Sequence, residues 1–415
     1  MKTDLYHLLK EPEEETSEEK IFSERVSQIP RSFLREILKI ASKPEIISFA
    51  GGVPNPDFFP IEKLKEAAID VFAYSGKEAL QYSNSEGYLP LREYIAARYK
   101  ITNGLIIKPE EILITNGSQQ GLDLIGKLLL DKGDKVLLEK PSYLGAIQAL
   151  SVFQPEFFNA DLREDGIDAE QVETILWENK IKLFYAVPDF QNPTGISYSL
   201  ERRKELAEIF KYHNTIIVED NPYGEIRFEG KVLPSFKNLL PDQTILLGSF
   251  SKIIAPGIRL GWVVAKKKYM DKLIIAKQGA DLHSNFLSQK IIYSFLKNNN
   301  LDNHLTRIKE GYKKQRDLML ELIENNFSKE IKITKPSGGL FLWLTLPEKA
   351  DAYEVLEKAV EEGIAFVPGN TFFQDGKGKN TIRLSFSSCN ETTMKTGILK
   401  LSNVLNNYIQ NLQLK

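Results

Sequence analysis

Between about residues 61 and 265, short apolar segments alternate with amphipathic helical segments, and this alternation constrains the fold more than any other feature. The apolar segments have the length and composition of buried strands, and they are EEILIT, DKVLLE, KLFYAV, NTIIVED, QTILLGSF and LGWVVA. Continuous apolar strands separated by helices are typical of a parallel sheet that is covered on both faces. The sequence therefore predicts an α/β domain with a mainly parallel sheet and helices on both faces.

The length of the chain, 415 residues, predicts more than one domain, because a single hydrophobic core rarely grows that large. We expect an acidic flexible tail over residues 1–20 and an N-terminal segment over 21–60 that packs on the small domain and the functional site. Residues 61–300 are expected to form the large domain, and residues 301–415 a smaller α+β domain. The boundary is expected within a long helical stretch at about 286–326.

Composition excludes several classes of function. The net charge of −2 offers no general basic surface for nucleic acid, and the single cysteine excludes an internal disulfide framework. The four histidines are not spaced as metal ligands, so no metal site is expected. The acidic opening EPEEETSEEK is unlike a signal peptide, and the apolar runs are shorter than the roughly 20 residues of a membrane span. These features predict a cytoplasmic protein.

Ligands of parallel α/β sheets bind beyond the carboxyl ends of the strands, so the residues at these ends are the first candidates for a site. Ser118 and Gln119 open a helix directly after a strand, and free N–H groups at such a position suit a phosphate. Asn192 lies in the turn sequence QNPTG after the strand KLFYAV. Asp220 ends the strand NTIIVED, where a buried carboxylate needs a lysine, a metal ion or a protonated ring nitrogen as its partner.

Lys252 is the most unusual of these residues, because it lies between two apolar strands in GSFSKIIAPGIRLGW. A desolvated lysine has a lowered pKa and becomes a nucleophile toward aldehydes. Ser249, Ser251 and Arg259 lie close to it in the sequence, and hydroxyl and guanidinium groups together suit a phosphate dianion. In the later part of the chain, Arg383 interrupts the apolar strand TIRLSF, where a buried arginine needs a carboxylate partner.

In this order, the motifs GSQQ, SYLGA, QNPTG, EDNPYG, SFSK with an arginine seven residues later, and IRLSF closely resemble those of fold-type I aminotransferases that depend on pyridoxal 5′-phosphate (PLP). The opening ISFAGGVPNPDFFP is similar to the branch that acts on 2-aminoadipate, kynurenine and aromatic amino acids. The resemblance covers the chain from about residue 27 to its C-terminus, and it implies a PLP transferase fold. Single motifs are of moderate specificity, but their ordered combination is highly specific.

The resemblance also implies roles for individual residues. Lys252 would form the Schiff base with PLP and move the proton of the substrate, and Asp220 would pair with the ring nitrogen. Tyr223 and Asn192 would bond the phenolate oxygen of the ring, and Tyr143 would stack on it. The implied phosphate ligands are Ser118, Gln119, Ser249, Ser251, Arg259 and, from the neighbouring subunit, Tyr82. A shared site of this kind implies a homodimer.

For the substrate, the resemblance implies that Arg383 binds the α-carboxylate, helped by Asn192 and by backbone near Gly51. Arg35, in the helical segment SFLREILK, either binds a distal carboxylate of the substrate or is an ordinary solvated arginine. Asp189 departs from the family pattern, which usually has a neutral residue there, and it adds a charge near the crevice.

The expected activity is transfer of an amino group from an L-amino acid (2-aminoadipate, aromatic or branched-chain) to a 2-oxo acid such as 2-oxoglutarate. Another PLP reaction, such as a β-lyase step, is the main alternative, because it would use the same carrier chemistry. A transcription regulator would need an added DNA-binding module, and only about 30 residues, an acidic segment, precede the matching region. A nicotinamide dehydrogenase would need a G-x-G-x-x-G motif after a strand, which the sequence lacks.

Overall fold

The computed structural model describes residues 21–27 and 33–414, so the predicted acidic tail over residues 1–20 lies outside the described part. The central element is an eight-stranded sheet with the strand order β2-β9-β8-β7-β6-β3-β4-β5. Its strands are β2 (Ile112–Thr115), β3 (Lys135–Lys140), β4 (Glu156–Arg163), β5 (Gly166–Ile167), β6 (Ile181–Ala186), β7 (Ile216–Asp220), β8 (Thr244–Ser249) and β9 (Gly261–Val264).

The predicted α/β class is confirmed, because β4, β3, β6, β7 and β8 are parallel neighbours. Successive residues of one strand pack into two separate cores. On β6, Leu183 and Tyr185 belong to the larger core, whereas Phe184 and Ala186 belong to the smaller one. Since side chains alternate across a strand, both faces of the sheet are buried, which explains the continuous apolar runs in the sequence.

Two features of the sheet differ from the sequence-based expectation. β9, predicted as one more parallel strand, runs antiparallel to both β8 and β2. The segment between β8 and β9 is too short for a parallel crossover, which needs about a dozen residues or more and usually a helix. β4, which lies next to the two-residue edge strand β5, was not predicted either, because its side chains are mostly only partly buried and include Asn159 and Asp161.

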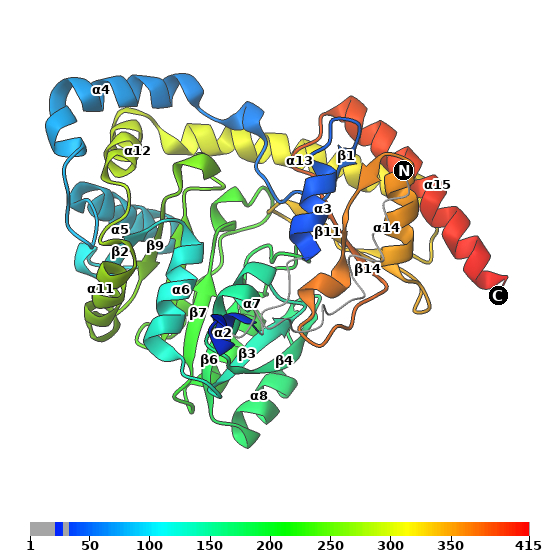
Figure 1. The fold of residues 1–415 in the computed structure, drawn as a ribbon, viewed down its shortest axis with the longest axis horizontal. Coiled ribbons are helices and arrows are strands. Elements are labelled where there is room, and N and C mark those ends of the chain that lie inside the picture. Colours follow the sequence, from blue (N-terminus) through cyan, green and yellow to red (C-terminus); the bar gives the residue numbers. More distant parts are fainter. Residues whose placement is uncertain (1–20, 28–32, 415) are drawn as a thin grey trace.

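Helices cover the sheet and connect its strands (Figure 1). The first group is α2 (Glu24–Ser27), α3 (Phe33–Ala41), α4 (Ile61–Ala79), α5 (Leu89–Asn103), α6 (Ser118–Leu129) and α7 (Leu144–Ser151). The second group is α8 (Ala169–Glu178), α9 (Leu200–Phe210), α10 (Phe236–Leu239), α11 (Lys267–Asp281) and α12 (Phe286–Asn298). No described helix is long and apolar enough to cross a membrane.

The second part of the chain contains a four-stranded antiparallel sheet of β10 (Lys332–Ile333), β11 (Phe341–Thr345), β14 (Thr381–Ser385) and β13 (Val367–Pro368). Three helices accompany it, namely α13 (Leu301–Asn326), α14 (Ala352–Glu361) and α15 (Glu391–Gln413). The helical stretch expected at about 286–326 is two helices, α12 and α13. The break lies at Asn299 and Asn300, and the Asn300 side chain accepts a hydrogen bond from the N–H of Asn303 and caps α13.

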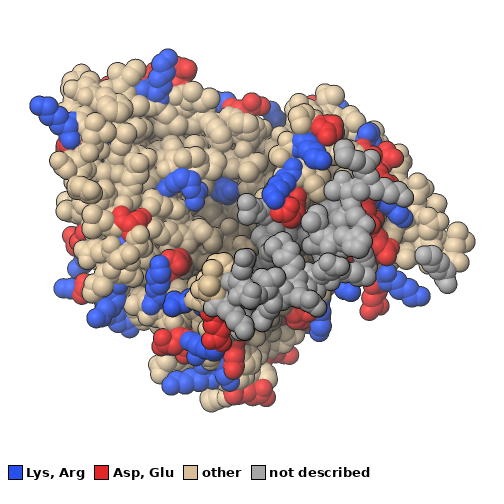
Figure 2. Space-filling model, viewed as in Figure 1, with Lys and Arg blue, Asp and Glu red and all other residues tan. Residues whose placement is uncertain are grey.

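The N-terminal segment reaches this second sheet region. β1 (Ile47–Ser48) pairs in parallel with β12 (Ile364–Ala365), and the Phe49 carbonyl accepts a hydrogen bond from the Ser385 N–H at 2.8 Å. Residues 50–52, which follow, are thereby carried toward the carboxyl ends of the large sheet. On the face seen in Figure 2, basic and acidic side chains are interspersed, in keeping with the near-zero net charge.

Candidate active site

A cavity of about 520 Å³ lies at the carboxyl ends of the parallel strands, where the sequence analysis places the site. Most of the predicted site residues line it together. They are Ser118, Gln119, Tyr143, Asn192, Asp220, Tyr223, Ser249, Ser251, Lys252, Arg259 and Arg383. These residues come from several separate loops and from the second sheet, so only the tertiary fold could bring them into one cavity.

The Lys252 side chain is half-buried in this cavity, and its Nζ donates a hydrogen bond to the Gly52 carbonyl at 2.9 Å. Burial lowers the pKa of Lys252 to about 8, and the nearby cations Arg383 and Arg259 act in the same direction. A lysine with this pKa has a substantial neutral fraction near pH 7. The neutral amine is the form that attacks an aldehyde and accepts a proton.

Asp220, the last residue of β7, is 2% exposed and faces the cavity. Its Oδ2 accepts a hydrogen bond from the Tyr185 hydroxyl at 2.9 Å, whereas its Oδ1 has no partner among the described residues. Burial raises the pKa of Asp220 to about 6, and the hydrogen bond from Tyr185 partly offsets this. A buried carboxylate with one free oxygen suits a cationic N–H donor supplied by a ligand.

Tyr185 is a positioning residue that the sequence analysis missed. It lies in the middle of β6, within the apolar run KLFYAV, and is fully buried. Its neighbours in sequence identify it only as a core residue. The pairing of β6 with β7 brings its hydroxyl group to Asp220.

The start of α6 forms a cradle for an anion. The residue that caps it, Gly117, has φ = 76° and contributes no side-chain hydrogen bond, so the first N–H groups of the helix face the cavity without a competing acceptor. A Cβ atom at Gly117 would lie 2.7 Å from Nη2 of Arg259, so only glycine permits this approach of the arginine. Ser249 lies close by, and its Oγ accepts a hydrogen bond from the Ser251 N–H at 3.1 Å. The N-terminus of α6, the serine hydroxyl groups and the guanidinium of Arg259 together suit a phosphate.

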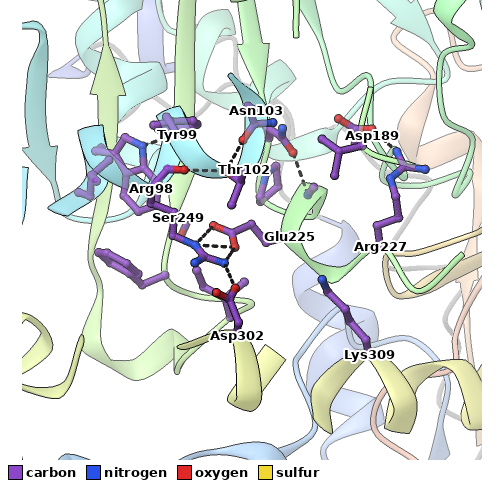
Figure 3. A pocket seen from close by; sticks show the side chains of 18 of the residues that line it. Arg98, Tyr99, Thr102, Asn103, Asp189, Glu225, Arg227, Ser249, Asp302 and Lys309 are labelled. Carbon is purple, nitrogen blue, oxygen red and sulfur yellow. Dashed lines mark hydrogen bonds and ion pairs between the residues drawn. The ribbon is translucent and has the colours of Figure 1, made fainter. Parts of the chain in front are cut away.

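Asp189 does not leave an uncompensated charge in this cavity. Its Oδ1 accepts hydrogen bonds from Arg203 Nη2 at 2.8 Å and from Arg227 Nη2 at 2.7 Å, and it lines a second cavity instead (Figure 3). The expected charge near the crevice is therefore neutralised by the buried Arg203 and the partly buried Arg227. Nothing in the isolated sequence indicated them as partners, since they follow Asp189 by 14 and 38 residues.

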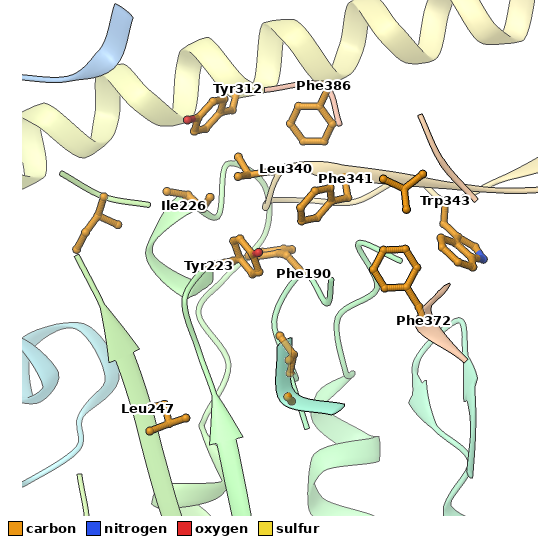
Figure 4. Packing of buried hydrophobic residues seen from close by; sticks show 14 of the residues in the cluster. Phe190, Tyr223, Ile226, Leu247, Tyr312, Leu340, Phe341, Trp343, Phe372 and Phe386 are labelled. Atoms are coloured by element: carbon orange, nitrogen blue, oxygen red, sulfur yellow. The ribbon is translucent and has the colours of Figure 1, made fainter. Parts of the chain in front are cut away.

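Arg383, on β14, is 3% exposed and reaches the cavity from the second sheet. Its Nη1 donates to Asn192 Oδ1 at 2.8 Å and its Nη2 to the Ala50 carbonyl at 2.6 Å. Its guanidinium lies 4.5 Å from the ring centroid of Phe341 and 4.9 Å from that of Phe372, and Figure 4 shows both rings in the buried cluster that also contains Tyr223. Nε has no partner among the described residues, so this buried cation has capacity for a carboxylate.

The aromatic side chains of the cavity remain hydrogen-bond donors at neutral pH. Burial raises the pKa of Tyr143 to about 12, and burial together with the Tyr143 hydroxyl raises the pKa of Tyr223 still further. The Tyr223 hydroxyl interacts with the Asn192 side chain, and its ring packs edge-on against Phe341 at 6.1 Å. The hydroxyl of Tyr223 is therefore fixed in position and protonated.

Two predicted residues, Tyr82 and Gly51, do not line the cavity of this chain. Tyr82 is 79% exposed and its ring contacts His283 at 5.9 Å. Gly51 lies between Ala50 and Gly52, whose carbonyls accept the hydrogen bonds from Arg383 and Lys252. Arg35 belongs to α3, but its side chain lies outside the described part of the structure. Leu38, one turn further along α3, does line the cavity.

Glu139, at the end of β3, is a buried carboxyl group that the sequence analysis did not identify. It is 1% exposed, and it accepts hydrogen bonds from the Tyr198 hydroxyl at 2.8 Å, from Gln191 Nε2 at 3.1 Å and from the Val187 N–H at 3.2 Å. It thereby connects β3 to the loop that carries Asn192. Burial raises the pKa of Glu139 to about 7, and the hydrogen bonds from Tyr198 and Gln191 oppose this rise.

The raised pKa of Glu139 makes the stability of the protein depend on pH. A carboxyl group whose pKa is higher in the folded state stabilises that state at low pH, and this contribution is lost as the pH rises through about 7. Glu139→Gln mimics the protonated form and should remove this dependence. The free energy of unfolding of the variant relative to wild type should therefore increase by about 2.5 kcal/mol between pH 5 and pH 8.

Urea denaturation of both proteins at a series of pH values measures this difference. Glu156→Gln, at an exposed position on the neighbouring strand β4, is the control. The difference between its free energy of unfolding and that of wild type should be the same at every pH. A constant difference between Glu139→Gln and wild type over the whole range would contradict the prediction.

The cavity fits PLP on three independent observations. The free Oδ1 of Asp220 suits the protonated ring nitrogen, the cradle of α6 and Arg259 suits the phosphate, and Lys252 suits the aldehyde. Within residues 21–27 and 33–414, no group of three or more His, Cys, Asp or Glu side chains could hold a metal ion.

Comparison with known proteins identifies the family. Residues 44–401 match the family model of the class I and II aminotransferases. The chain is 41% identical to aromatic-amino-acid aminotransferase 1 of Thermococcus litoralis (93% of this chain, 94% of the relative) and 40% identical to the 2-aminoadipate transaminase of Thermus thermophilus (92% and 96%). The crystal structure of the α-aminoadipate aminotransferase of Thermus thermophilus, complexed with N-(5′-phosphopyridoxyl)-L-leucine, superposes with a TM-score of 0.89 at 39% identity (95% and 100% covered).

The chain belongs to the class I and II aminotransferases. It is a PLP-dependent enzyme that transfers an amino group from an amino acid to a 2-oxo acid, and both the predicted fold type and the predicted activity are confirmed.

Proposed function

We propose that this aminotransferase acts on L-2-aminoadipate and on amino acids with aromatic or branched apolar side chains, with 2-oxoglutarate as the acceptor. The observation that carries the proposal is the convergence of Lys252, the free carboxylate oxygen of Asp220 and the buried Arg383 in one cavity. Relatives at about 40% identity that are named for aromatic amino acids and for 2-aminoadipate support the choice of donors.

We assign the cofactor end of the cavity to the residues at the strand ends. Asp220 would bind the ring nitrogen, Tyr223 and Asn192 the phenolate oxygen, and Tyr143 the face of the ring. The proposed phosphate ligands are Ser118, Gln119, Ser249, Ser251 and Arg259. Gln119 is supported by its anchored position, since its Nε2 donates to the Gly145 carbonyl at 2.7 Å.

When bound, PLP withdraws electrons from the α-carbon of the amino acid and so allows its proton to leave. Lys252 is the group that would accept this proton and return it, because its lowered pKa leaves the amine partly neutral at pH 7. Asp220 would keep the opposite end of the site negatively charged, and Tyr185 holds its Oδ2 in place. The Gly52 carbonyl orients Nζ of Lys252 before a substrate arrives.

Arg383 would bind the α-carboxylate of the substrate. Its Nη1 is held by Asn192 and its Nη2 by the Ala50 carbonyl, next to Gly51, so the guanidinium is fixed before binding. A carboxylate would replace or share these contacts and would satisfy the free Nε. With the carboxylate fixed here, the Cα–H bond of the substrate is held within the same cavity as Lys252.

The side chain of the substrate would face the part of the cavity lined by Leu38, Leu144 and Gln148. Two apolar residues suit aromatic and branched aliphatic side chains, and an additional cation from α3 would suit the distal carboxylate of 2-aminoadipate. Arg35 is our candidate for this cation, because it precedes Leu38 by one turn of the same helix.

A donor panel tests these assignments. Steady-state kcat/KM should be measured for 2-aminoadipate, phenylalanine and leucine with 2-oxoglutarate, in wild type and in Arg35→Ala. Arg35→Ala would lose one charge-assisted contact, which contributes about 1.5–3 kcal/mol. This loss should lower kcat/KM for 2-aminoadipate by about 10- to 150-fold and leave kcat/KM for leucine nearly unchanged. Lys39→Ala, one turn later on α3 and paired with Glu36, is the matched control and should behave as wild type.

Two results would contradict the proposal. An equal decrease of kcat/KM for all three donors in Arg35→Ala would show that Arg35 does not bind a distal carboxylate. Release of product from a β-substituted amino acid without consumption of 2-oxoglutarate, together with no transfer from any donor of the panel, would indicate a β-lyase instead.

We also propose that the enzyme is a homodimer. Apolar side chains are exposed on α4 and just after it, and they are Ile69, Phe72, Tyr74, Leu80 and Tyr82. Exposed apolar residues this close together are typical of a protein interface. Tyr82, which is unused in its own subunit's cavity, would then contribute to the phosphate site of the partner.

We propose a division of the chain into domains and a cytoplasmic location for the enzyme. We place the boundary between the large domain (61–300) and the small domain (301–415) at the break between α12 and α13, with 21–60 joining the small domain through β1. The single cysteine, Cys389, is buried and unpaired, which is compatible with the reducing cytoplasm that we propose for this enzyme.

A further inference from the structure

A second cavity of about 240 Å³ lies behind the active site, between α5, the loop after β7 and α13 (Figure 3). Pro222 and Ser249 line both cavities, so the chain segments after β7 and β8 form the wall between them. None of the residues to which we assign roles toward the substrate lines this second cavity. It is therefore a separate compartment, and its size is that of a small metabolite.

One side of this cavity is apolar and aromatic. Tyr94, Tyr99, Phe250, Ile253 and Trp262 line it. Trp262 is held by a hydrogen bond from its Nε1 to the Tyr99 hydroxyl at 3.0 Å and by the ring of Phe250, whose centroid lies 4.8 Å away. This wall is preformed and rigid, and it suits the flat or branched apolar body of a ligand.

The carboxylates around the cavity are already neutralised. Glu225 and Asp302 both accept hydrogen bonds from Arg98, whose Nε lies 2.9 Å from Glu225 Oε2 and whose Nη2 lies 2.8 Å from Asp302 Oδ1. Asp189 is neutralised by Arg203 and Arg227. No carboxylate that lines this cavity in the described structure is therefore left to attract a cationic ligand.

The cations around the cavity are not all neutralised. Lys309, half-buried on α13, forms no hydrogen bond or close ion pair with any described residue, although its charge acts on Asp302 at longer range. Figure 3 shows its side chain rising from the helix toward the cavity. Arg227 uses Nη2 for Asp189, but its buried Nε has no partner within the described part of the chain. Lys309, whose ammonium N–H groups are unused, thus lines the same cavity as the guanidinium of Arg227, and two cations at one space favour an anion.

We propose that this cavity is a ligand site for a small monocarboxylate with an aromatic or branched aliphatic body. The carboxylate would bind to Lys309 and Arg227, and the apolar body would lie against Trp262, Phe250 and Ile253. The inference goes beyond the proposed transamination and does not depend on its donors, because no residue assigned to the substrate is involved.

Calorimetric titration of the PLP-loaded enzyme with phenylacetate tests the proposal. Lys309→Ala should weaken binding at this site by at least about tenfold, because a charge-assisted hydrogen bond is lost. Lys313→Ala is the matched control. Lys313 lies one turn later on α13, does not line the cavity and pairs with Glu229 and Asp317, so its loss should leave the affinity unchanged.

Two further probes separate the parts of the ligand. Acetate, which lacks the ring, and phenylacetamide, which lacks the charge, should each bind at least about tenfold more weakly than phenylacetate. Binding of phenylacetate at Arg383 in the active site would be the same in both lysine variants, so the difference between them reports only the second cavity. Equal affinity in wild type, Lys309→Ala and Lys313→Ala, or no binding of phenylacetate to wild type at millimolar concentration, would overturn the proposal.

Discussion

Lys252→Ala should lower kcat by about 10²- to 10⁴-fold, the usual contribution of a well-placed proton-transfer group, while the protein still binds PLP. Turnover is lost because no other lysine lines the active-site cavity within the described residues. Binding persists because Asp220, Arg259 and the start of α6 are unchanged. Steady-state kinetics and equilibrium dialysis with PLP measure the two effects separately.

The same lysine should be the point of covalent attachment. The purified enzyme should be yellow, and after reduction with borohydride, peptide mapping should find the pyridoxyl group on Lys252. Lys237 is an internal control, because burial also lowers its pKa to about 8, yet its Nζ is bound to the carbonyls of Pro241 and Thr244 and lies outside the cavity. Modification of Lys237, or full activity of Lys252→Ala, would reject the assignment.

Arg383→Ala should raise KM for the amino acid far more than it weakens PLP binding. Removing one partner of a buried, charge-assisted pair costs on the order of 2–5 kcal/mol, which corresponds to about a 30- to 4,000-fold change in affinity. The structure gives the reason, since Arg383 is buried, is held by Asn192 and the Ala50 carbonyl, and has a free Nε.

Arg383→Lys distinguishes charge from geometry. Lysine keeps the positive charge but offers no planar pair of donors, so it should recover only part of the lost affinity for substrate. Circular dichroism and the Kd for PLP control for misfolding of either variant. A loss of PLP affinity that exceeds the rise in KM would move Arg383 out of the substrate site.

The core of the sheet could be predicted from the sequence because its central strands are buried on both faces. The apolar runs that became β2, β3, β6, β7 and β8 could not be exposed loops, and each was found within a residue or two. Strand direction was not predictable in the same way. Antiparallel β9 is as apolar as the parallel strands of the sheet, and the half-exposed strand β4 has too few apolar residues to stand out.

Most of the candidate site could be predicted because its residues are chemically out of place. A lysine between two apolar strands, an aspartate at the end of another and an arginine inside a third are costly unless a ligand compensates them. The residues that support them were not predictable. Tyr185, Glu139 and Arg203 lie within ordinary helix and strand patterns, and only packing gives them partners.

The sequence by itself determined the fold class and the family and indicated the candidate reactive groups, because apolar patterning and unusual charged residues are local properties of the chain. The tertiary structure decided how these groups are held. It placed Arg383 beside Asn192 across a separation of 191 residues and left one oxygen of Asp220 free. It also neutralised Asp189 with two arginines and left Lys309 without a close ion pair among the described residues at a second cavity. The hydrogen-bond partners, the burial and the pKa of each of these side chains depend on distances between segments that are far apart in the sequence. Only folding sets those distances.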